Sequence, residues 1–276
     1  MPHIIAILLV RNEDRFLDRV LRNIENFCDR IIVTDNGSQD RTKEILHHWQ
    51  QSCPTLECHS IAHPSESHKR IAGFAGTDTW VFGVDGDEIY DPRGLTHLRH
   101  DILAGRYAEN WRLVGHTLHC ETFNESDSTA AGFMAPPSRT ATKLFNFAAI
   151  DYWQGCAQRL HGGDLKFKQG FCETRQYRTF EHTSWDQSDF RCLHMAFVRR
   201  SSLQNQKDSA RLNVSESWAG GWRAGLRRLS ALVSGQPPSS NYKQASYRLG
   251  ERTQVDTRAF LAPDHETGIS AGGLIQ

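Results

Sequence analysis

The chain has 276 residues, and its 32 Lys and Arg residues balance its 32 Asp and Glu residues. This zero formal charge excludes a global field that would draw the protein onto nucleic acid, so we expect no nucleic-acid partner. No apolar stretch of the sequence reaches the roughly 20 residues that a membrane-spanning helix needs. The seven cysteines include no C-x-x-C pair, which argues against a zinc ribbon or a disulfide framework and favours a cytoplasmic location.

The first part of the chain alternates between strand-like and helix-like segments. The continuous apolar run Ile4 to Val10 predicts a buried first strand, with no basic leader before it. Apolar residues at steps of three and four then predict a helix from Leu17 to Phe27. The unit repeats, with strands expected at residues 30–34, 56–62 and 80–84 and helices around residues 45–49, 68–76 and 92–102. This alternation predicts an α/β fold, with a mostly parallel sheet flanked by helices.

The second part of the chain has a less regular pattern. Residues 112–120 and 142–147 are strand-like, and a polar loop is expected at residues 121–137 between them. Residues 218–233 place Trp and Leu beside arginines, which predicts an amphipathic helix that packs on the core or touches a membrane. We therefore expect one domain with a regular half at residues 1–110 and an irregular half at residues 111–205. Residues 206–276 are expected to form a helical or partly disordered extension.

A group of carboxylates follows the strand expected at residues 80–84. It consists of Asp85, Asp87 and Glu88, with Gly86 leaving space for the close approach of a ligand. In open parallel sheets, ligands bind outside the carboxyl ends of the strands, which is where this group lies. Clustered carboxylates repel one another unless a cation, a hydrogen-bond network or a raised pKa relieves the repulsion. The pattern predicts a Mn²⁺ or Mg²⁺ site at Asp85 and Asp87, and the alternative is an ordinary solvated turn.

Other polar residues follow the first two expected strands. Val10, Arg11 and Glu13 lie at the end of the first strand, and Asp35 follows the second in a sequence that is also ordinary turn material. Arg70, on the third expected helix, is a candidate for contact with phosphates, although basic residues on short helices are usually only solvated. We predict these five residues as parts of one ligand-binding site at the carboxyl ends of the strands.

Three segments of the sequence carry a resemblance to a known family. They are LLVRNE at residues 8–13, IVTDNGSQDRT at residues 32–42 and WVFGVDGDE at residues 80–88. In their order and spacing, these segments resemble the signature segments of family 2 glycosyltransferases of the GT-A fold. The resemblance covers roughly residues 4–100, and in the second half it is limited to residues 143–145, 160–162 and 193–194.

The resemblance implies a GT-A fold and the transfer of a sugar, with inversion, from a UDP- or GDP-sugar to an acceptor hydroxyl. Residues 1–110 would bind the nucleotide sugar, and residues 111–205 the acceptor, a glycan or a lipid-linked saccharide. A lipid-linked acceptor would add a peripheral contact at the inner face of the membrane. In this reading Asp35 would recognise the base, Val10 and Arg11 the nucleoside, and Asp85 and Asp87 the metal on the diphosphate. His194, in a strand-like run, is at the place of a late metal or phosphate ligand.

The transfer reaction also needs a general base, because the acceptor hydroxyl loses its proton as it attacks. The acids in the expected region are Glu173, Glu181, Asp186 and Asp189. Position along the chain favours Glu181 and Asp186 as catalytic residues, and the others are expected to be surface charges.

Other functions explain the same motifs less well. A phosphatase of the haloacid dehalogenase type also uses Asp-x-Asp and magnesium, but after its first strand and with Thr or Val where this chain has Ile89. Sugar nucleotidyltransferases and dinucleotide-binding oxidoreductases need a glycine-rich loop after the first strand, and residues 11–14 contain no glycine. A non-catalytic binding protein of GT-A shape is the remaining alternative, which an assay for donor hydrolysis would distinguish.

Overall fold

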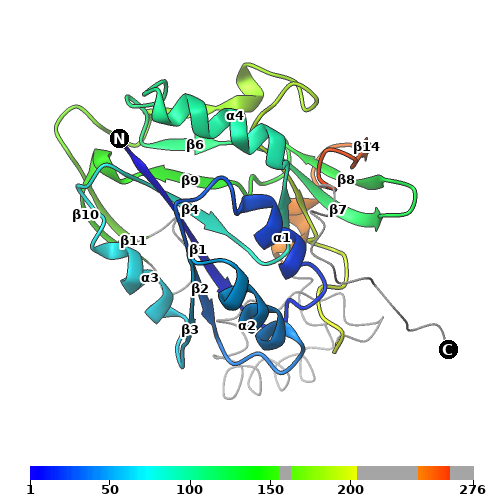
Figure 1. Cartoon of the computed structure of the whole chain (residues 1–276). Helices are drawn as coiled ribbons and strands as arrows, with labels where there is room; N and C mark the ends of the chain where they lie inside the picture. The colour runs from blue at the N-terminus through cyan, green and yellow to red at the C-terminus, as the bar shows by residue number, and fades with distance from the viewer. Residues whose placement is uncertain (156–162, 204–241, 262–276) are drawn as a thin grey trace, which may run out of the picture.

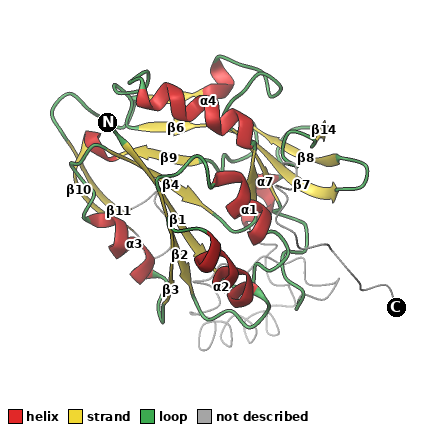
Figure 2. Cartoon of the chain, in the orientation of Figure 1, coloured by secondary structure: helices red, strands yellow, loops and turns green. Residues whose placement is uncertain are grey.

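The structure of the chain is a computed structural model that describes residues 1–155, 163–203 and 242–261. The amphipathic helix expected at residues 218–233 and the segment 160–162 lie outside the described residues. Within them, no helix is long and apolar enough to cross a membrane. The described chain forms a large sheet with helices on it and a smaller sheet beside it (Figures 1 and 2).

The large sheet confirms the α/β fold expected from the alternating pattern. Four neighbouring strands are parallel, and the strand that follows them, β9 (Lys143–Asn146), is antiparallel to β4 (Thr79–Val84). β1 (His3–Val10) contains the apolar run from which the first strand was predicted, and it lies inside the sheet between β4 and β2 (Arg30–Asp35). The order of the seven strands is β12 (Gln176–Arg178), β6 (Arg112–Val114), β9 (Lys143–Asn146), β4 (Thr79–Val84), β1 (His3–Val10), β2 (Arg30–Asp35) and β3 (Leu56–Ser60).

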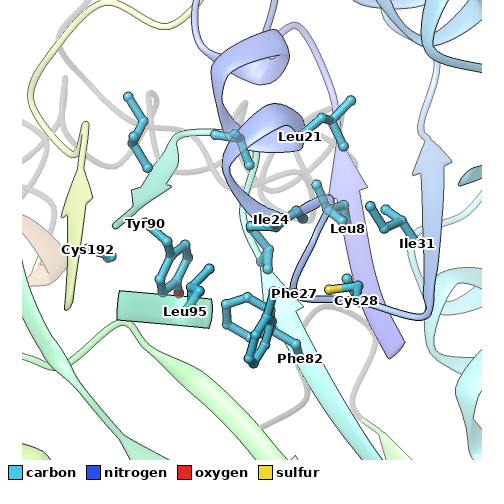
Figure 3. Close-up of a cluster of buried hydrophobic side chains, with 14 of the residues drawn as sticks. Leu8, Leu21, Ile24, Phe27, Cys28, Ile31, Phe82, Tyr90, Leu95 and Cys192 are labelled. Atoms are coloured by element: carbon cyan, nitrogen blue, oxygen red, sulfur yellow. The ribbon is translucent and has the colours of Figure 1, made fainter. Parts of the chain in front are cut away.

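Both faces of the large sheet are covered, as a parallel sheet requires. Side chains alternate along β1, so Ile4 and Leu8 enter one core while Ile5 and Ile7 enter another. The first core, partly shown in Figure 3, packs against helices α1 (Leu17–Ile24), α2 (Thr42–Ser52) and α4 (Pro92–Leu103). The second packs against α3 (Ser65–Ala72) and the hairpin of β10 (Ile150–Gly155) and β11 (Gly163–Phe167).

Helix α4 begins where the sequence predicts it. Asp91 is the N-cap, and its carboxylate accepts hydrogen bonds from the backbone N–H groups of Arg93 and Gly94. Pro92 occupies the first helical position, where its missing N–H costs nothing. Asp91 Oδ2 also lies 2.8 Å from Arg191 Nη2, so this ion pair connects the start of the helix to a strand from much later in the chain.

The second sheet corrects the polar loop that we expected at residues 121–137. β7 continues to Asn124, and residues 129–135 form a strand that pairs antiparallel with it. This strand is rich in Ala and Gly, which have low β propensity, so its pairing with β7 rather than its composition makes it a strand. The order of the sheet is β14 (Arg252–Asp256), β8 (Thr129–Ala135), β7 (His116–Asn124), β13 (Arg191–His194) and β5 (Glu88–Tyr90).

The acidic motif is the junction between the two sheets. β4 ends at Val84 in the large sheet, and β5 begins at Glu88 in the small one, so residues 85–87 join them. The single strand expected at residues 112–120 divides in the same way at Gly115, with β6 in the large sheet and β7 in the small one. Short elements complete the described chain: η1 (Phe147–Ala149), η2 (Thr179–Glu181) and α7 (Tyr242–Tyr247).

Candidate functional site

The turn at residues 85–87 packs against the end of β1. A Cβ atom at Gly86 would lie 3.0 Å from Glu13 Cγ and 3.2 Å from Val10 Cγ1, closer than ordinary packing allows. The glycine therefore lets the acidic turn approach β1, and it brings Val10, Glu13 and the turn together as the sequence predicts. A contact between Gly86 and a ligand stays a prediction.

A lysine from the second half of the chain lies beside two of the carboxylates. Lys143 Nζ is 3.1 Å from Asp85 Oδ2 and 3.5 Å from Glu88 Oε1. The other Glu88 oxygen accepts hydrogen bonds from Asp85 N at 3.1 Å and from the Tyr90 hydroxyl at 3.2 Å. Burial raises the pKa of Glu88 to about 8, with Lys143 opposing the rise and the charge of Asp85 adding to it. A fixed cation and a raised pKa thus relieve the repulsion among the clustered carboxylates.

The register of the second sheet places three side chains in one row. His194 of β13 lies opposite Glu88 of β5 on one side and opposite His119 of β7 on the other. His194 Nδ1 is 2.9 Å from His119 Nδ1, and His194 Nε2 is 3.8 Å from Asp87 Oδ1. Both His194 and Asp87 are 1% exposed. The strand pairing therefore brings His194 to the acidic turn, and its role as a metal or phosphate ligand stays a prediction.

The hydrogen-bond partners of the two histidines fix their tautomers. His119 Nε2 lies 2.5 Å from the carbonyl oxygen of Arg139, and because a carbonyl only accepts, this nitrogen must carry a hydrogen. A neutral His119 then accepts on Nδ1, so His194 Nδ1 is the donor between the rings. The lone pair of a neutral His194 is consequently on Nε2, the nitrogen that faces Asp87. The Tyr247 ring stacks on His119 at 4.4 Å and holds it in place.

Asp87 and His194 are spaced as two ligands of one divalent cation. A carboxylate oxygen and a neutral imidazole nitrogen are ligand types that Mn²⁺ accepts, and the Asp85 carboxylate lies in the same turn. Two ligands at about 2.1 Å from one ion lie between about 3 and 4.2 Å apart, which includes the 3.8 Å between Asp87 Oδ1 and His194 Nε2. Within the part of the chain that the structure describes, no three His, Cys, Asp or Glu side chains are grouped to hold a metal by themselves.

The end of β2 supplies the predicted Asp35. It pairs with Val10 in the parallel register, it is buried, and its carboxylate accepts hydrogen bonds from Ser38 N at 3.1 and 3.3 Å. The turn geometry that its sequence suggested is therefore present, and contact with a base stays a prediction. Glu13 lies nearby with its Oε1 3.3 Å from Arg200 Nη1, and Arg11 is half-buried at the same edge.

Three predicted residues have surroundings other than the acidic turn. Arg70 is exposed in the last turn of α3, the end of the helix that leads to the amino end of β4. Glu181 forms a 3.1 Å ion pair with Arg178, and Asp186 is 92% exposed and lies 3.8 Å from Arg191. None of these observations brings the three residues to the acidic turn, so their roles stay predictions.

A cavity of about 180 Å³ lies beside the turn. Asp85, Glu88 and His194 line one part of it, and three basic residues, Arg112, Arg139 and Lys143, line the rest together with apolar and neutral groups. Sequence reasoning gave no role to these basic residues or to His119. His119 is one of 14 histidines, and only the pairing of β7 with β13 distinguishes it from the others.

The chain has a mostly parallel α/β sheet, an acidic turn after β4 and a second sheet joined to the first. This is the GT-A fold, the architecture that the resemblance implies. Residues 5–108 match the family model described as glycosyl transferase family 2. The resemblance inferred from three motifs is thus confirmed over this stretch, which contains all three of them.

Known proteins resemble parts of the chain. A TPR repeat-containing protein of Synechococcus elongatus is 28% identical over 102 residues, which are 37% of this chain and 25% of that protein. A crystal structure of S. aureus TarS covers 54% of this chain and 48% of its own, at 15% identity and a TM-score of 0.38. Glucosyl-3-phosphoglycerate synthase from Mycobacterium tuberculosis covers 42% and 44%, at 20% identity and a TM-score of 0.33. This chain therefore spans less than half the length of each of these proteins.

Proposed function

We propose that the chain is a glycosyltransferase that moves a sugar from a nucleoside-diphosphate sugar to an acceptor hydroxyl. The observation that carries the proposal is the turn of Asp85, Gly86 and Asp87 at the carboxyl end of β4, with His194 Nε2 3.8 Å from Asp87. Ligands of open parallel sheets bind at this edge. The family match at residues 5–108 supports the same activity.

In this proposal Asp85, Asp87 and His194 hold Mn²⁺ or Mg²⁺ at the diphosphate. The ion, when bound, would stabilise the negative charge that develops on the leaving diphosphate. The buried hydrogen bond that His194 donates to His119 orients the His194 ring, and Lys143 holds the Asp85 carboxylate. Val10, Arg11, Glu13 and Asp35 line the adjoining strand ends, where the nucleoside would lie, and Arg70 stays a candidate for phosphate contact.

The acceptor would attack from the second half of the chain with inversion at the anomeric carbon. We keep Glu181 and Asp186 as candidates for the general base. Glu181 is next to β12, whose Arg178 lies opposite Val114, and Val114 lines the cavity beside Asp85. Glu181→Gln or Asp186→Asn should lower turnover by about 10² to 10⁴-fold with nearly constant donor affinity. If neither substitution changes turnover tenfold, the base lies elsewhere.

The acceptor in this proposal is a glycan or a lipid-linked saccharide, and the protein acts in the cytoplasm, with peripheral membrane contact through residues 218–233. Truncation after residue 212 should weaken association with liposomes if those residues contact the membrane. Unchanged liposome binding would contradict that part of the proposal.

Two measurements test the proposed activity. Thermal stabilisation by a panel of nucleotides and nucleotide sugars, with and without Mn²⁺, identifies the donor, because a ligand that binds only the folded state raises its stability. Release of nucleoside diphosphate from that donor then tests turnover. Donor binding without turnover would favour the non-catalytic binding protein. A phosphatase of the haloacid dehalogenase type would instead release phosphate from sugar phosphates, and the position of the motif after β4 rather than β1 disfavours it.

A further inference from the structure

One face of the large sheet is basic where it forms the floor of the cavity. Side chains alternate between the two faces of β6 and β9, and Leu113 and Leu144 point into the main core. Their neighbours on both strands point the other way and line the cavity: Arg112, Val114, Lys143 and Phe145. Arg178 of β12 lies opposite Val114 and extends this basic face toward the edge of the sheet.

The charge of Lys143 is compensated, whereas that of Arg112 is not. Lys143 is in contact with Asp85 and Glu88. Arg112 donates to the neutral Gln176 side chain at 2.6 Å, and its guanidinium lies 5.2 Å from the centre of the Trp111 ring. Among the described residues, none of the ion pairs includes Arg112, and its Nε is buried without a hydrogen-bond partner.

The surroundings of Arg112 disfavour its positive charge. Burial lowers the pKa of Arg112, the positive charge of Arg178 lowers it further, and the opposing effect of Glu173 is smaller. A partly buried cation without a counter-ion is costly, so an anion that enters the cavity would relieve this cost. A guanidinium also matches phosphate and carboxylate groups with two parallel hydrogen bonds.

We propose that the cavity binds an anionic group, a carboxylate or a phosphate, on the acceptor or on the transferred sugar, with Arg112 as its main ligand. This inference rests on the proposed function, in which the sugar is transferred beside Asp85. Arg139 lines the same cavity and adds a second positive charge. The cavity of about 180 Å³ is large enough for such a group rather than for a single water molecule.

The anion in question is distinct from the diphosphate of the donor. Arg112 lies opposite Phe145, and Phe145 lies opposite Val81 of β4, four residues before Asp85, which follows the end of that strand. At a rise of about 3.3 Å per residue, the backbone of Arg112 is about 13 Å along the sheet from the acidic turn. The diphosphate belongs at the turn with the metal, so Arg112 would meet a group beyond the bond that is cleaved.

Titration calorimetry with Mn²⁺ present tests the proposal, with two pairs of probes that differ in charge. The donor pair is UDP-glucuronate and UDP-glucose, and the acceptor pair is glycerol 3-phosphate and glycerol, the latter two titrated with UDP present. The proteins are wild type, Arg112→Gln, Arg112→Lys and Arg175→Gln. Arg175 is a matched control because it pairs with Glu109 near the same strand and does not line the cavity.

Wild type should bind the charged member of one pair at least about tenfold more tightly than the neutral member, as a hydrogen-bonded ion contact allows. The pair that shows this preference identifies donor or acceptor as the source of the anion. Arg112→Gln should abolish the preference, Arg112→Lys should retain part of it, and Arg175→Gln should keep all of it.

Equal binding within both pairs by wild type, or a preference that survives in Arg112→Gln, would overturn the proposal. Failure of the proposed function has a different signature, because wild type would then bind UDP and GDP no better with Mn²⁺ than with EDTA. A preference for glycerol 3-phosphate over glycerol remains measurable even in that case, so the two ideas are tested separately.

Discussion

The two halves of the chain supply different kinds of side chain to one site. The half up to residue 110 supplies the carboxylates, and the later half supplies the basic partners that face them. The facing atoms are 3.1 Å apart for Asp85 and Lys143, 3.8 Å for Asp87 and His194, and 3.3 Å for Glu13 and Arg200. The first half is built from parallel strands that follow one another in sequence, and the second from strands that pair with distant segments. The positions of the carboxylates therefore follow from the order of strands along the chain, whereas the positions of their basic partners depend on the register of long-range strand pairing.

The largest expected effect comes from removing one charge on the acidic side. Asp87→Asn keeps the shape of the side chain but removes the negative charge of a proposed metal ligand. The affinity for UDP or GDP in the presence of Mn²⁺ should therefore fall by about 100-fold, as loss of a buried charged contact implies. Titration calorimetry measures the change. Asp127→Asn, at an exposed position in the turn between β7 and β8, is the matched control and should bind as wild type does. Equal affinities of Asp87→Asn and wild type would remove Asp87 from the metal site.

The contrast between the halves also explains which parts of the site could be predicted from the sequence and which could not. Parallel strand ends always meet at one edge of a sheet, so Asp35 and Asp85 could be placed together from periodicity alone. α4 could be placed from its Asp91 and Pro92 cap. His119, in contrast, reaches the site only because β7 pairs with β13 in one register. A shift of one residue would move it to the opposite face, and no local signal sets that register.

Similar reasons account for the expectations that differ from the structure. β8 contains Ala and Gly where strand propensity favours branched residues, so the segment resembled a loop. The apolar pattern of residues 112–120 continues across Gly115, although the strand changes sheets there. Gly115 is required at this point because a Cβ atom would lie within 2.2 Å of the Phe190 carbonyl oxygen, a contact that only the folded chain creates.

A second prediction disturbs the pairing of the second half. A Cβ atom at Gly132 would collide with the backbone carbonyl of His119 across β7 and β8. Gly132→Ala should therefore lower the free energy of unfolding by about 2 kcal/mol or more, because the two strands must separate to admit the methyl group. Urea denaturation measures the loss. Gly73→Ala is the control, since a Cβ atom there has nothing within 4 Å, and it should stay within about 0.5 kcal/mol of wild type. Similar losses for both variants would contradict the close pairing at His119.

A third prediction tests whether the orientation of the His194 ring, and not only the presence of His194, matters for metal binding. His119→Phe keeps an aromatic ring beside Tyr247 but removes the acceptor of the hydrogen bond from His194 Nδ1. The Mn²⁺-dependent gain in nucleotide affinity should fall about tenfold, as for other residues that orient a metal ligand. His119→Gln, which retains an acceptor oxygen, should lose less.

The readout for His119 is the ratio of nucleotide affinities with Mn²⁺ and with EDTA. A general loss of structure would lower both affinities, whereas a positioning role lowers only the first. An unchanged ratio in His119→Phe would show that the interaction between the two histidines does not tune the metal ligand.

The smallest expected effect concerns His116, three residues before His119 on β7. It is 5% exposed, and burial lowers its pKa, with the positive charge of Arg191 adding to the decrease. A folded-state pKa below the unfolded value of about 6.5 means that His116 contributes stability at higher pH and that this is lost as pH falls below that value. His116→Phe should therefore lose less free energy of unfolding than wild type between pH 7 and pH 5. His100→Gln, at an exposed position, should follow wild type, and equal losses in all three proteins would contradict the assignment.

The most direct test of the account is the binding of nucleoside diphosphates to wild type with and without metal. In the proposed site the carboxylates and His194 would contribute only part of a coordination shell, so metal and nucleotide should each raise the affinity for the other. Titration calorimetry with UDP and with GDP, in Mn²⁺ and in EDTA, should show one of them bound at least about tenfold more tightly with Mn²⁺. If wild type binds neither nucleotide more tightly with Mn²⁺ than with EDTA, a metal-dependent transfer at Asp85 and Asp87 is contradicted.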